Sequence, residues 1–115
     1  MNKHLDQETY YERLRKRRAE IMVTLEHLQN ELRTLNGNRD WIDHASYKSR
    51  VDLLDSLTDW YVKESARIDS ALSRIAEGKY GVCLACRSPI DARRLETSPE
   101  VAFCAECQGM REALG

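Results

Sequence analysis

The chain has 115 residues and a formal net charge of -1, with 42% hydrophobic and 32% charged residues. Apolar residues are too plentiful, and the net charge is too small, for an intrinsically disordered protein. A general nucleic-acid binder would usually be strongly basic, which argues against that class. No stretch approaches the roughly 20 apolar residues of a membrane span, and the N-terminus lacks the apolar segment of a signal peptide. We therefore expect a soluble cytoplasmic protein that makes no membrane contact.

The composition changes near Gly78. Residues 1–77 contain no proline and a single glycine, whereas residues 78–115 hold both prolines, the other four glycines and all four cysteines. Glycine and proline interrupt helices, so their absence favours long helices in the first part. We predict a helical domain over residues 1–77 and a small, loop-rich domain over residues 78–115.

Two series of apolar residues in the first part repeat at the heptad spacing of a coiled coil. The first series is Leu14, Ile21, Leu25, Leu28, Leu32 and Leu35. The second series is Val51, Leu54, Leu57, Tyr61, Ser65, Ile68, Leu72 and Ile75. Asn36-Gly37-Asn38 and Glu77-Gly78 carry residues that end helices. Two long helices joined by a short turn run antiparallel, so we predict a mainly α fold built on a hairpin of roughly 45 Å, with its tip at about residues 37–46.

The second part carries a cysteine pattern that is typical of a zinc site. The spacing C-x2-C-x17-C-x2-C is formed by Cys83, Cys86, Cys104 and Cys107. Two such pairs complete a tetrahedral site, and four thiolates leave no position for water or substrate. We predict one structural Zn²⁺ in a small C4 zinc-finger module with a short C-terminal helix. Two disulfides, a redox dithiol and an iron–sulfur cluster are the alternatives.

The predicted tip carries two acidic residues, Asp40 and Asp43. One interpretation is purely structural, because aspartate is a good N-cap and acidic groups are favoured in the first helical turn. The other is functional: two carboxylates at the end of a hairpin could approach a metal ion or basic groups of a partner. Trp41 and Ile42 beside them would add apolar contact surface.

These features together resemble the DksA/TraR family of bacterial RNA polymerase regulators. The tip matches the family's D-x-x-D-x-A motif through Asp40, Asp43 and Ala45. The zinc region matches through the four cysteines and their neighbours Tyr80, Gly81, Ile90, Arg94, Leu95 and Pro99. The resemblance extends over roughly residues 5–115.

The resemblance implies a transcription regulator without enzymatic activity. Members of the family insert their coiled-coil hairpin into the secondary channel of RNA polymerase, which brings the tip acids near the catalytic magnesium. They modulate initiation without binding a specific DNA sequence, and many act together with the alarmone ppGpp in the stringent response.

Two departures from the family pattern change what is expected. Arg87 follows the second cysteine, where the family commonly has glycine, so the geometry of this turn should differ without loss of a ligand. The positions that match the family's ppGpp contacts are Trp60, Arg67 and Gln108. Only Arg67 is basic, and a phosphate-rich ligand needs several cations or donors. We therefore expect weak or no dependence on ppGpp.

Other functions remain open at the level of sequence. An acidic hairpin tip is also compatible with a Gre-like transcript-cleavage helper, and four cysteines are compatible with a zinc-ribbon nucleic-acid binder or a thiol redox enzyme using Cys83 and Cys86. A basic run early in the first helix forms either a solvated face or a contact with an acidic rim of the polymerase. The run comprises Arg13, Arg15, Lys16, Arg17 and Arg18.

Overall fold

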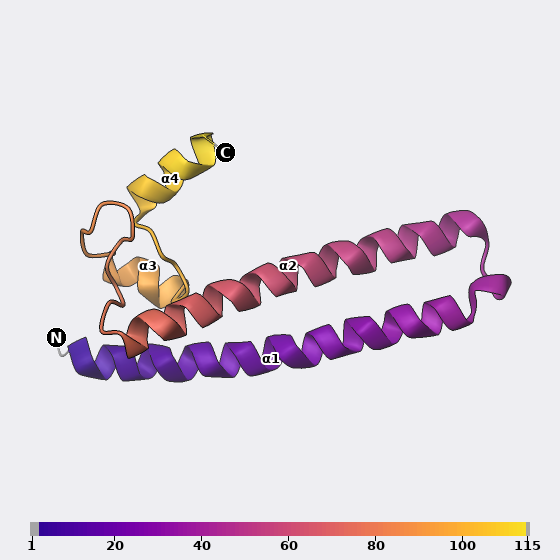
Figure 1. The fold of residues 1–115 in the computed structure, drawn as a ribbon, viewed down its shortest axis with the longest axis horizontal. Coiled ribbons are helices and arrows are strands. Elements are labelled where there is room, and N and C mark those ends of the chain that lie inside the picture. The colour runs from indigo at the N-terminus through magenta and orange to yellow at the C-terminus, as the bar shows by residue number, and fades with distance from the viewer. Residues whose placement is uncertain (1–2, 115) are drawn as a thin grey trace. The chain divides into compact units, whose positions relative to one another are not determined.

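The computed structural model describes residues 3–114, which form helices and connecting loops with no extended strand (Figure 1). Its elements are α1 (Lys3–Gly37), the 3-10 helix η1 (Arg39–Trp41), α2 (His44–Ala76), α3 (Ala92–Thr97) and α4 (Ala105–Leu114). The predicted mainly α fold is confirmed. None of the helices in the described range is both long and apolar enough to cross a membrane.

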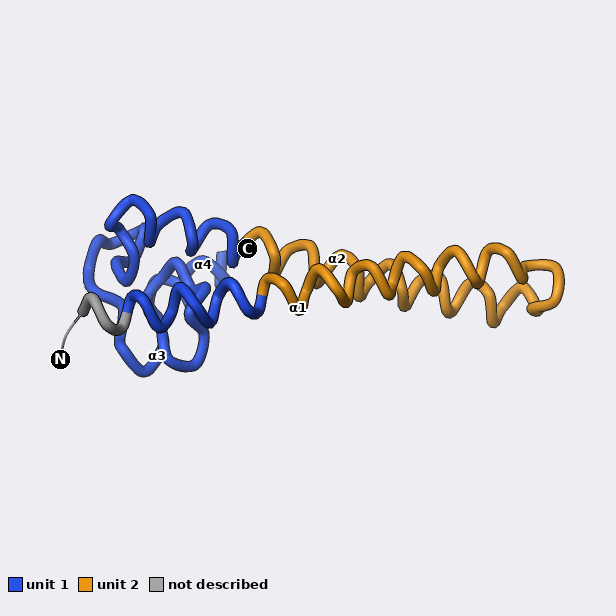
Figure 2. The backbone as a smooth tube through the Cα atoms, turned by 90° about the horizontal axis from the view of Figure 1, so that it is seen from below, with its two compact units in different colours: residues 1–17, 67–115 blue, residues 18–66 orange. Residues whose placement is uncertain are grey.

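The chain divides into two compact units, which Figure 2 shows in different colours. One unit consists of residues 18–66, the other of residues 1–17 together with residues 67–115. Each long helix therefore contributes to both units.

The unit of residues 18–66 is an antiparallel hairpin of α1 and α2, which lie side by side (Figure 1). Leu28 and Leu35 from α1 and Leu54 from α2 form its buried cluster. Partly buried side chains pack against this cluster: Leu25, Leu32, Ile42, Tyr47, Val51 and Tyr61. Burial of an apolar side chain contributes about 1.5–3 kcal/mol, so this seam holds the two helices together. The predicted two-helix hairpin is confirmed.

One position in the second predicted series is wrong. Leu57 is exposed, at 38% of its surface, whereas Thr58 is half-buried. If Thr58 takes the place of Leu57 in the series, the spacings between its members alternate regularly between three and four residues. This alternation keeps the members on one side of the helix. The Thr58 hydroxyl donates a hydrogen bond to the Leu54 carbonyl at 2.7 Å, so the polar group is satisfied within its own helix. The seam therefore passes through a threonine.

Both long helices end where the sequence predicted. Asn38 closes α1, because its backbone N–H donates to the Thr34 carbonyl at 3.1 Å and its side-chain amide donates to the same oxygen at 2.8 Å. Gly78 follows α2 with a φ of 73°, a left-handed conformation that glycine adopts easily. The N–H of Lys79 then donates to the Arg74 carbonyl, at 2.8 Å, as in a Schellman motif.

The other unit joins the first turns of α1 and the last turns of α2 to the loop-rich C-terminal segment. Tyr10 lies on Tyr80, with ring centroids 5.7 Å apart, and both residues are buried. The Tyr80 hydroxyl donates to the Pro99 carbonyl at 2.8 Å, and burial raises its pKa. Arg74 is also buried, and its guanidinium donates to the Val101 carbonyl at 3.2 Å. These contacts hold the segment after residue 78 against both helices.

Candidate functional site

The four cysteines come together in one cluster. Their sulfur atoms all lie within 4.8 Å of one another, and the sulfurs of Cys86 and Cys104 are 3.9 Å apart. A tetrahedral zinc ion with bonds of about 2.3 Å would place its sulfur ligands roughly 3.8 Å apart. None of the four cysteines forms a disulfide. The donor set and its spacing therefore fit one structural Zn²⁺, as predicted.

The first cysteine pair lies on a tight turn. The N–H of Cys83 donates to the Ser88 carbonyl at 2.8 Å, and the N–H of Arg87 donates back to the Cys83 carbonyl at 3.0 Å. To close this turn, Arg87 takes a φ of 65°, and it is the only non-glycine residue in the described range with a positive φ. Glycine would adopt this conformation without steric cost.

The second cysteine pair lies at the start of α4. The Cys104 carbonyl accepts the first helical hydrogen bond, from the N–H of Gln108 at 2.9 Å. The Cys104 sulfur accepts the N–H of Cys107 at 3.4 Å, so its side chain caps the helix. The N–H of Leu84 donates to the Ala102 carbonyl at 2.9 Å and ties the two cysteine pairs together.

The thiols differ in how readily they ionise. Hydrogen bonding from the backbone of Cys86 lowers the pKa of the Cys83 thiol to about 6. Hydrogen bonding with the Cys104 side chain raises the pKa of the Cys107 thiol to about 12. Close thiols cannot all become thiolates without a compensating cation. A divalent metal supplies that charge, and metal binding releases the protons.

At the tip, the two acidic residues have different environments. Asp43 is the N-cap of α2: its carboxylate accepts the N–H groups of Ala45 at 3.0 Å and Ser46 at 3.2 Å. Hydrogen bonds from the side chain and the backbone of Ser46 hold the pKa of Asp43 below its usual value. Asp40 lies in η1, is exposed, and accepts no hydrogen bond from any described residue. The structural interpretation therefore applies to Asp43, whereas the Asp40 carboxylate is available for a partner.

The tip is braced by side chains on both helices. The Tyr47 hydroxyl from α2 donates to the Asn36 side chain of α1 at 2.5 Å. The Arg39 guanidinium lies over the Tyr47 ring, 4.7 Å from its centroid. Sequence reasoning missed this arrangement, because Asn36 and Tyr47 meet only once the chain has turned.

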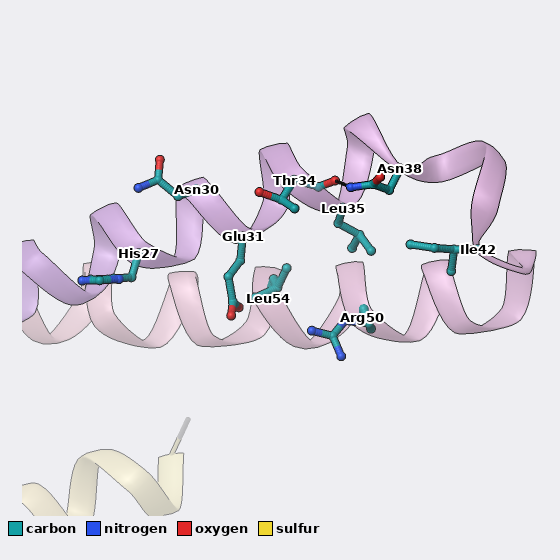
Figure 3. Close-up of a pocket in the computed structure, with 9 residues that line it drawn as sticks. All are labelled: His27, Asn30, Glu31, Thr34, Leu35, Asn38, Ile42, Arg50 and Leu54. Carbon is teal, nitrogen blue, oxygen red and sulfur yellow. Dashed lines mark hydrogen bonds between the residues drawn. The ribbon is translucent and has the colours of Figure 1, made fainter.

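A groove of about 590 Å³ runs along the hairpin beside the tip (Figure 3). Its lining consists of His27, Asn30, Glu31, Thr34, Leu35, Asn38, Ile42, Arg50 and Leu54. In Figure 3 the Ile42 side chain points back from the tip toward Leu35. Ile42 therefore anchors the tip segment to the apolar seam.

Comparison with known proteins agrees with this geometry. Residues 10–75 match the domain described as DnaK suppressor protein-like, N-terminal domain, and residues 78–113 match the prokaryotic dksA/traR C4-type zinc finger. The chain belongs to the DksA/TraR family.

Two solved structures of this family resemble the chain. Transcription factor DksA2 from Pseudomonas aeruginosa has a TM-score of 0.83 at 32% identity, covering 93% of this chain and 83% of that one. DnaK suppressor protein from Agrobacterium tumefaciens has a TM-score of 0.62 at 35% identity, and the match covers 90% of this chain and 91% of that one.

Curated relatives match a smaller part of their own length. The RNA polymerase-binding transcription factor DksA of Caulobacter vibrioides is 33% identical over 93 residues, which is 81% of this chain and 63% of that protein. An uncharacterized protein of Aquifex aeolicus is 36% identical over 69 residues, which is 60% of this chain and 48% of that protein. The chain thus spans between about half and two thirds of these relatives.

The residues that the family resemblance aligns with ppGpp contacts, Trp60, Arg67 and Gln108, lie on α2 and α4. Trp60 belongs to the unit of residues 18–66, and Arg67 and Gln108 belong to the other unit. Trp60 packs edge-on against Tyr61, with ring centroids 5.0 Å apart. The Gln108 amide donates to Glu112 at 3.0 Å.

The predicted basic run does not act as one group. Arg13 is half-buried, and its guanidinium donates to the Glu96 carbonyl at 2.8 Å. Arg15 lies over the Tyr11 ring, 5.7 Å from its centroid. Lys16 and Arg17 are exposed. Arg13 thus helps to attach α3 to α1, so the run combines a structural arginine with solvent-exposed cations.

Proposed function

We propose that this chain is a DksA-like transcription regulator that binds bacterial RNA polymerase and modulates initiation. In this proposal the hairpin tip enters the secondary channel, where Asp40 acts near the catalytic magnesium. The zinc module has a structural role, and the chain catalyses no reaction of its own. Because RNA polymerase works in the cytoplasm, the proposal places this protein there as well.

The observation that carries the proposal is the unbonded Asp40 carboxylate at the tip of a family hairpin. Asp43 has a capping role that explains its presence, whereas no contact with a described residue explains Asp40. An exposed carboxylate without a local role is available for a metal ion or a basic group of a partner. The relatives named above as transcription factors support the same function.

The test compares two substitutions that preserve folding. Asp40→Asn removes one charge from an exposed side chain, and Asp43→Asn keeps an oxygen for the N-cap, since asparagine caps as well as aspartate. We expect the Asp40→Asn protein to bind polymerase with unchanged affinity but to lose regulation of an rRNA-type promoter in transcription in vitro. Full regulation by the Asp40→Asn protein would contradict the proposed role of the tip.

A transcript-cleavage assay separates this proposal from a Gre-like function. A cleavage helper would stimulate hydrolysis of the transcript in backtracked complexes by positioning magnesium. Only one tip carboxylate, that of Asp40, is free of hydrogen bonds to the described residues, which leaves fewer ligands for such an ion. We therefore expect no stimulation of cleavage.

We further propose that regulation is largely independent of ppGpp. Trp60 and Gln108 occupy two of the positions where the family resemblance implies basic contacts. The loss of two charge-assisted hydrogen bonds, at about 1.5–3 kcal/mol each, would weaken binding at least tenfold. Regulation is measured with and without ppGpp, and each value is compared with that of polymerase alone under the same condition. We expect the protein to regulate equally in both conditions. Strong stimulation by ppGpp in the wild-type protein would contradict it.

A further inference from the structure

Trp41 is a large apolar side chain in an unusual place. It exposes 88% of its surface at the hairpin tip, whereas the next residue, Ile42, is half-buried against the apolar seam. Trp41 has no aromatic or cation partner among the described residues. Full burial of such a side chain would remove a large apolar surface from water. Because the Trp41 indole stays in water, it contributes no such burial to folding of the hairpin.

The backbone around Trp41 is held in a defined turn. The N–H of Trp41 donates to the Asn38 carbonyl at 3.0 Å, and the N–H of Ile42 donates to the Arg39 carbonyl at 3.3 Å. The Arg39–Tyr47 contact and the anchored Ile42 side chain fix the turn from both sides. A side chain presented on a fixed turn loses little conformational entropy when it binds. Tryptophan is also among the residues that most often carry binding energy at interfaces.

The charges around Trp41 indicate the kind of partner. Asp40 precedes it with an unbonded carboxylate, and the one arginine of the turn, Arg39, already lies over the Tyr47 ring. A nucleic-acid backbone needs cations near the stacking side chain and is repelled by a carboxylate. An apolar pocket on a protein, rimmed by a cation, would accept both the indole and the carboxylate.

We propose that Trp41 is an anchoring residue that inserts into an apolar pocket on the protein partner of the tip. This inference rests on the proposed function, in which that partner is RNA polymerase, and it assigns two separate roles. Trp41 sets the affinity of the tip, whereas Asp40 sets the effect on initiation once the tip is bound.

The experiment measures the affinity for core RNA polymerase, first without nucleic acid and then with nucleic acid bound to the polymerase. It compares the wild-type protein with Trp41→Ala, Trp41→Phe and the matched control Leu53→Ala, which removes another exposed apolar side chain of the hairpin. We expect Trp41→Ala to weaken binding at least about tenfold, Trp41→Phe to weaken it less, and Leu53→Ala to change it little. Thermal unfolding of each variant should match that of the wild-type hairpin.

A second measurement reports burial of the indole directly. In a Trp60→Phe background, Trp41 is replaced biosynthetically by 5-hydroxytryptophan, which is excited at wavelengths that the polymerase's own tryptophans absorb weakly. Burial in an apolar pocket should make this side chain inaccessible to an aqueous quencher when polymerase is added.

The outcomes distinguish the anchor from the proposed function. Wild-type affinity of Trp41→Ala, with the label still accessible in the complex, would overturn the anchor and leave polymerase binding intact. A loss of affinity that appears only with nucleic acid in the polymerase would indicate stacking on a base and would also overturn the protein pocket. Failure of the wild-type protein to bind polymerase would overturn both proposals.

Discussion

The two aspartates of the tip show how one motif can combine a structural and a functional residue. Both are exposed, but only Asp43 is positioned by backbone N–H groups, because it immediately precedes α2. Asp40 lies three residues earlier in η1, where no N–H group of the described residues donates to its side chain. Capping of the second helix by aspartate was one of two interpretations of the sequence. The sequence did not indicate which aspartate would be the cap, because both stand before the same helical pattern.

Stability at low pH should depend on the carboxylate of Asp43. The pKa of Asp43 is lower in the folded protein than its usual value of about 3.9. Its contribution to stability is therefore complete above that value and is lost as the pH falls through the folded pKa. We expect Asp43→Ala to lower the melting temperature at pH 7, whereas Asp40→Ala should not.

Asp43→Asn provides the control for this prediction. Asparagine retains the cap but cannot titrate, so the variant should stay close to wild type at pH 7 and should lose less stability between pH 5 and pH 2. Thermal unfolding followed by circular dichroism at several pH values measures both effects. Equal melting temperatures for Asp43→Ala and Asp40→Ala would contradict the capping role.

Arg87 is a second residue whose role follows from its backbone. A left-handed conformation costs a residue with a Cβ roughly 1–2 kcal/mol, while glycine loses about 0.4–1 kcal/mol more entropy on folding. Arg87→Gly should therefore stabilise the zinc module by about 0.5–1 kcal/mol. The measurement is the rate at which a chelator removes zinc, which should fall.

Arg87→Ala is the matched control, because alanine removes the guanidinium and keeps the steric cost. It should lose zinc at the wild-type rate. If Arg87→Ala and Arg87→Gly slow the loss of zinc equally, the charge of Arg87 matters and its conformation does not.

At the level of elements, the heptad pattern predicted the hairpin and misplaced one residue of its seam. Hydrophobicity alone favours Leu57 over Thr58, but a leucine at position 57 would break the alternation of three and four residues. The structure keeps the alternation and buries part of the threonine instead. The geometry of the helix pair thus outweighs the hydrophobicity of one side chain. The cross-turn pair of Asn36 and Tyr47 has no such periodic signal and could not be predicted.

Two leucine substitutions test the corrected seam. Leu28 is buried at 9% exposure, so Leu28→Ala should cost about 2–5 kcal/mol. Leu57 lies outside the seam, and Leu57→Ala should cost well under 1 kcal/mol, as most surface substitutions do. Urea unfolding followed by helical circular dichroism measures both. Similar losses in the free energy of unfolding for the two variants would show that Leu57 belongs to the seam.

For the whole molecule, the sequence predicted the zinc ligands but not the contacts that hold the cysteine-containing segment against the long helices. Cysteine spacing is a local signal, and all four predicted ligands meet. The packing of Tyr10 on Tyr80 and the bond from Arg74 to Val101 join residues far apart in the chain. No spacing rule predicts such contacts, because they depend on how the loop folds back on the helices. The division of the chain near residue 77 stays a prediction.

Removal of zinc tests how far the two compact units depend on each other. The seam of Leu28, Leu35 and Leu54 contains no cysteine, and α1 and α2 hold most of the helical residues. Cys104→Ser should therefore abolish tight zinc binding and increase proteolysis after residue 78, while most of the helical circular dichroism signal persists. Zinc supplies folding energy to small modules that lack a large core, so the loss should be confined to the segment that contains the cysteines.

Chelation of the wild-type protein provides the reversible counterpart. Added zinc should restore protease resistance to the chelated wild-type chain and not to Cys104→Ser, which keeps only three thiolate ligands. Cleavage within residues 78–114 should come before cleavage within residues 18–66, because only the former segment holds the metal ligands. Simultaneous cleavage of both segments, with loss of the helical signal, would show that the hairpin needs the metal. In that case the seam would be too weak to fold alone, and its buried leucines would contribute less than their burial indicates.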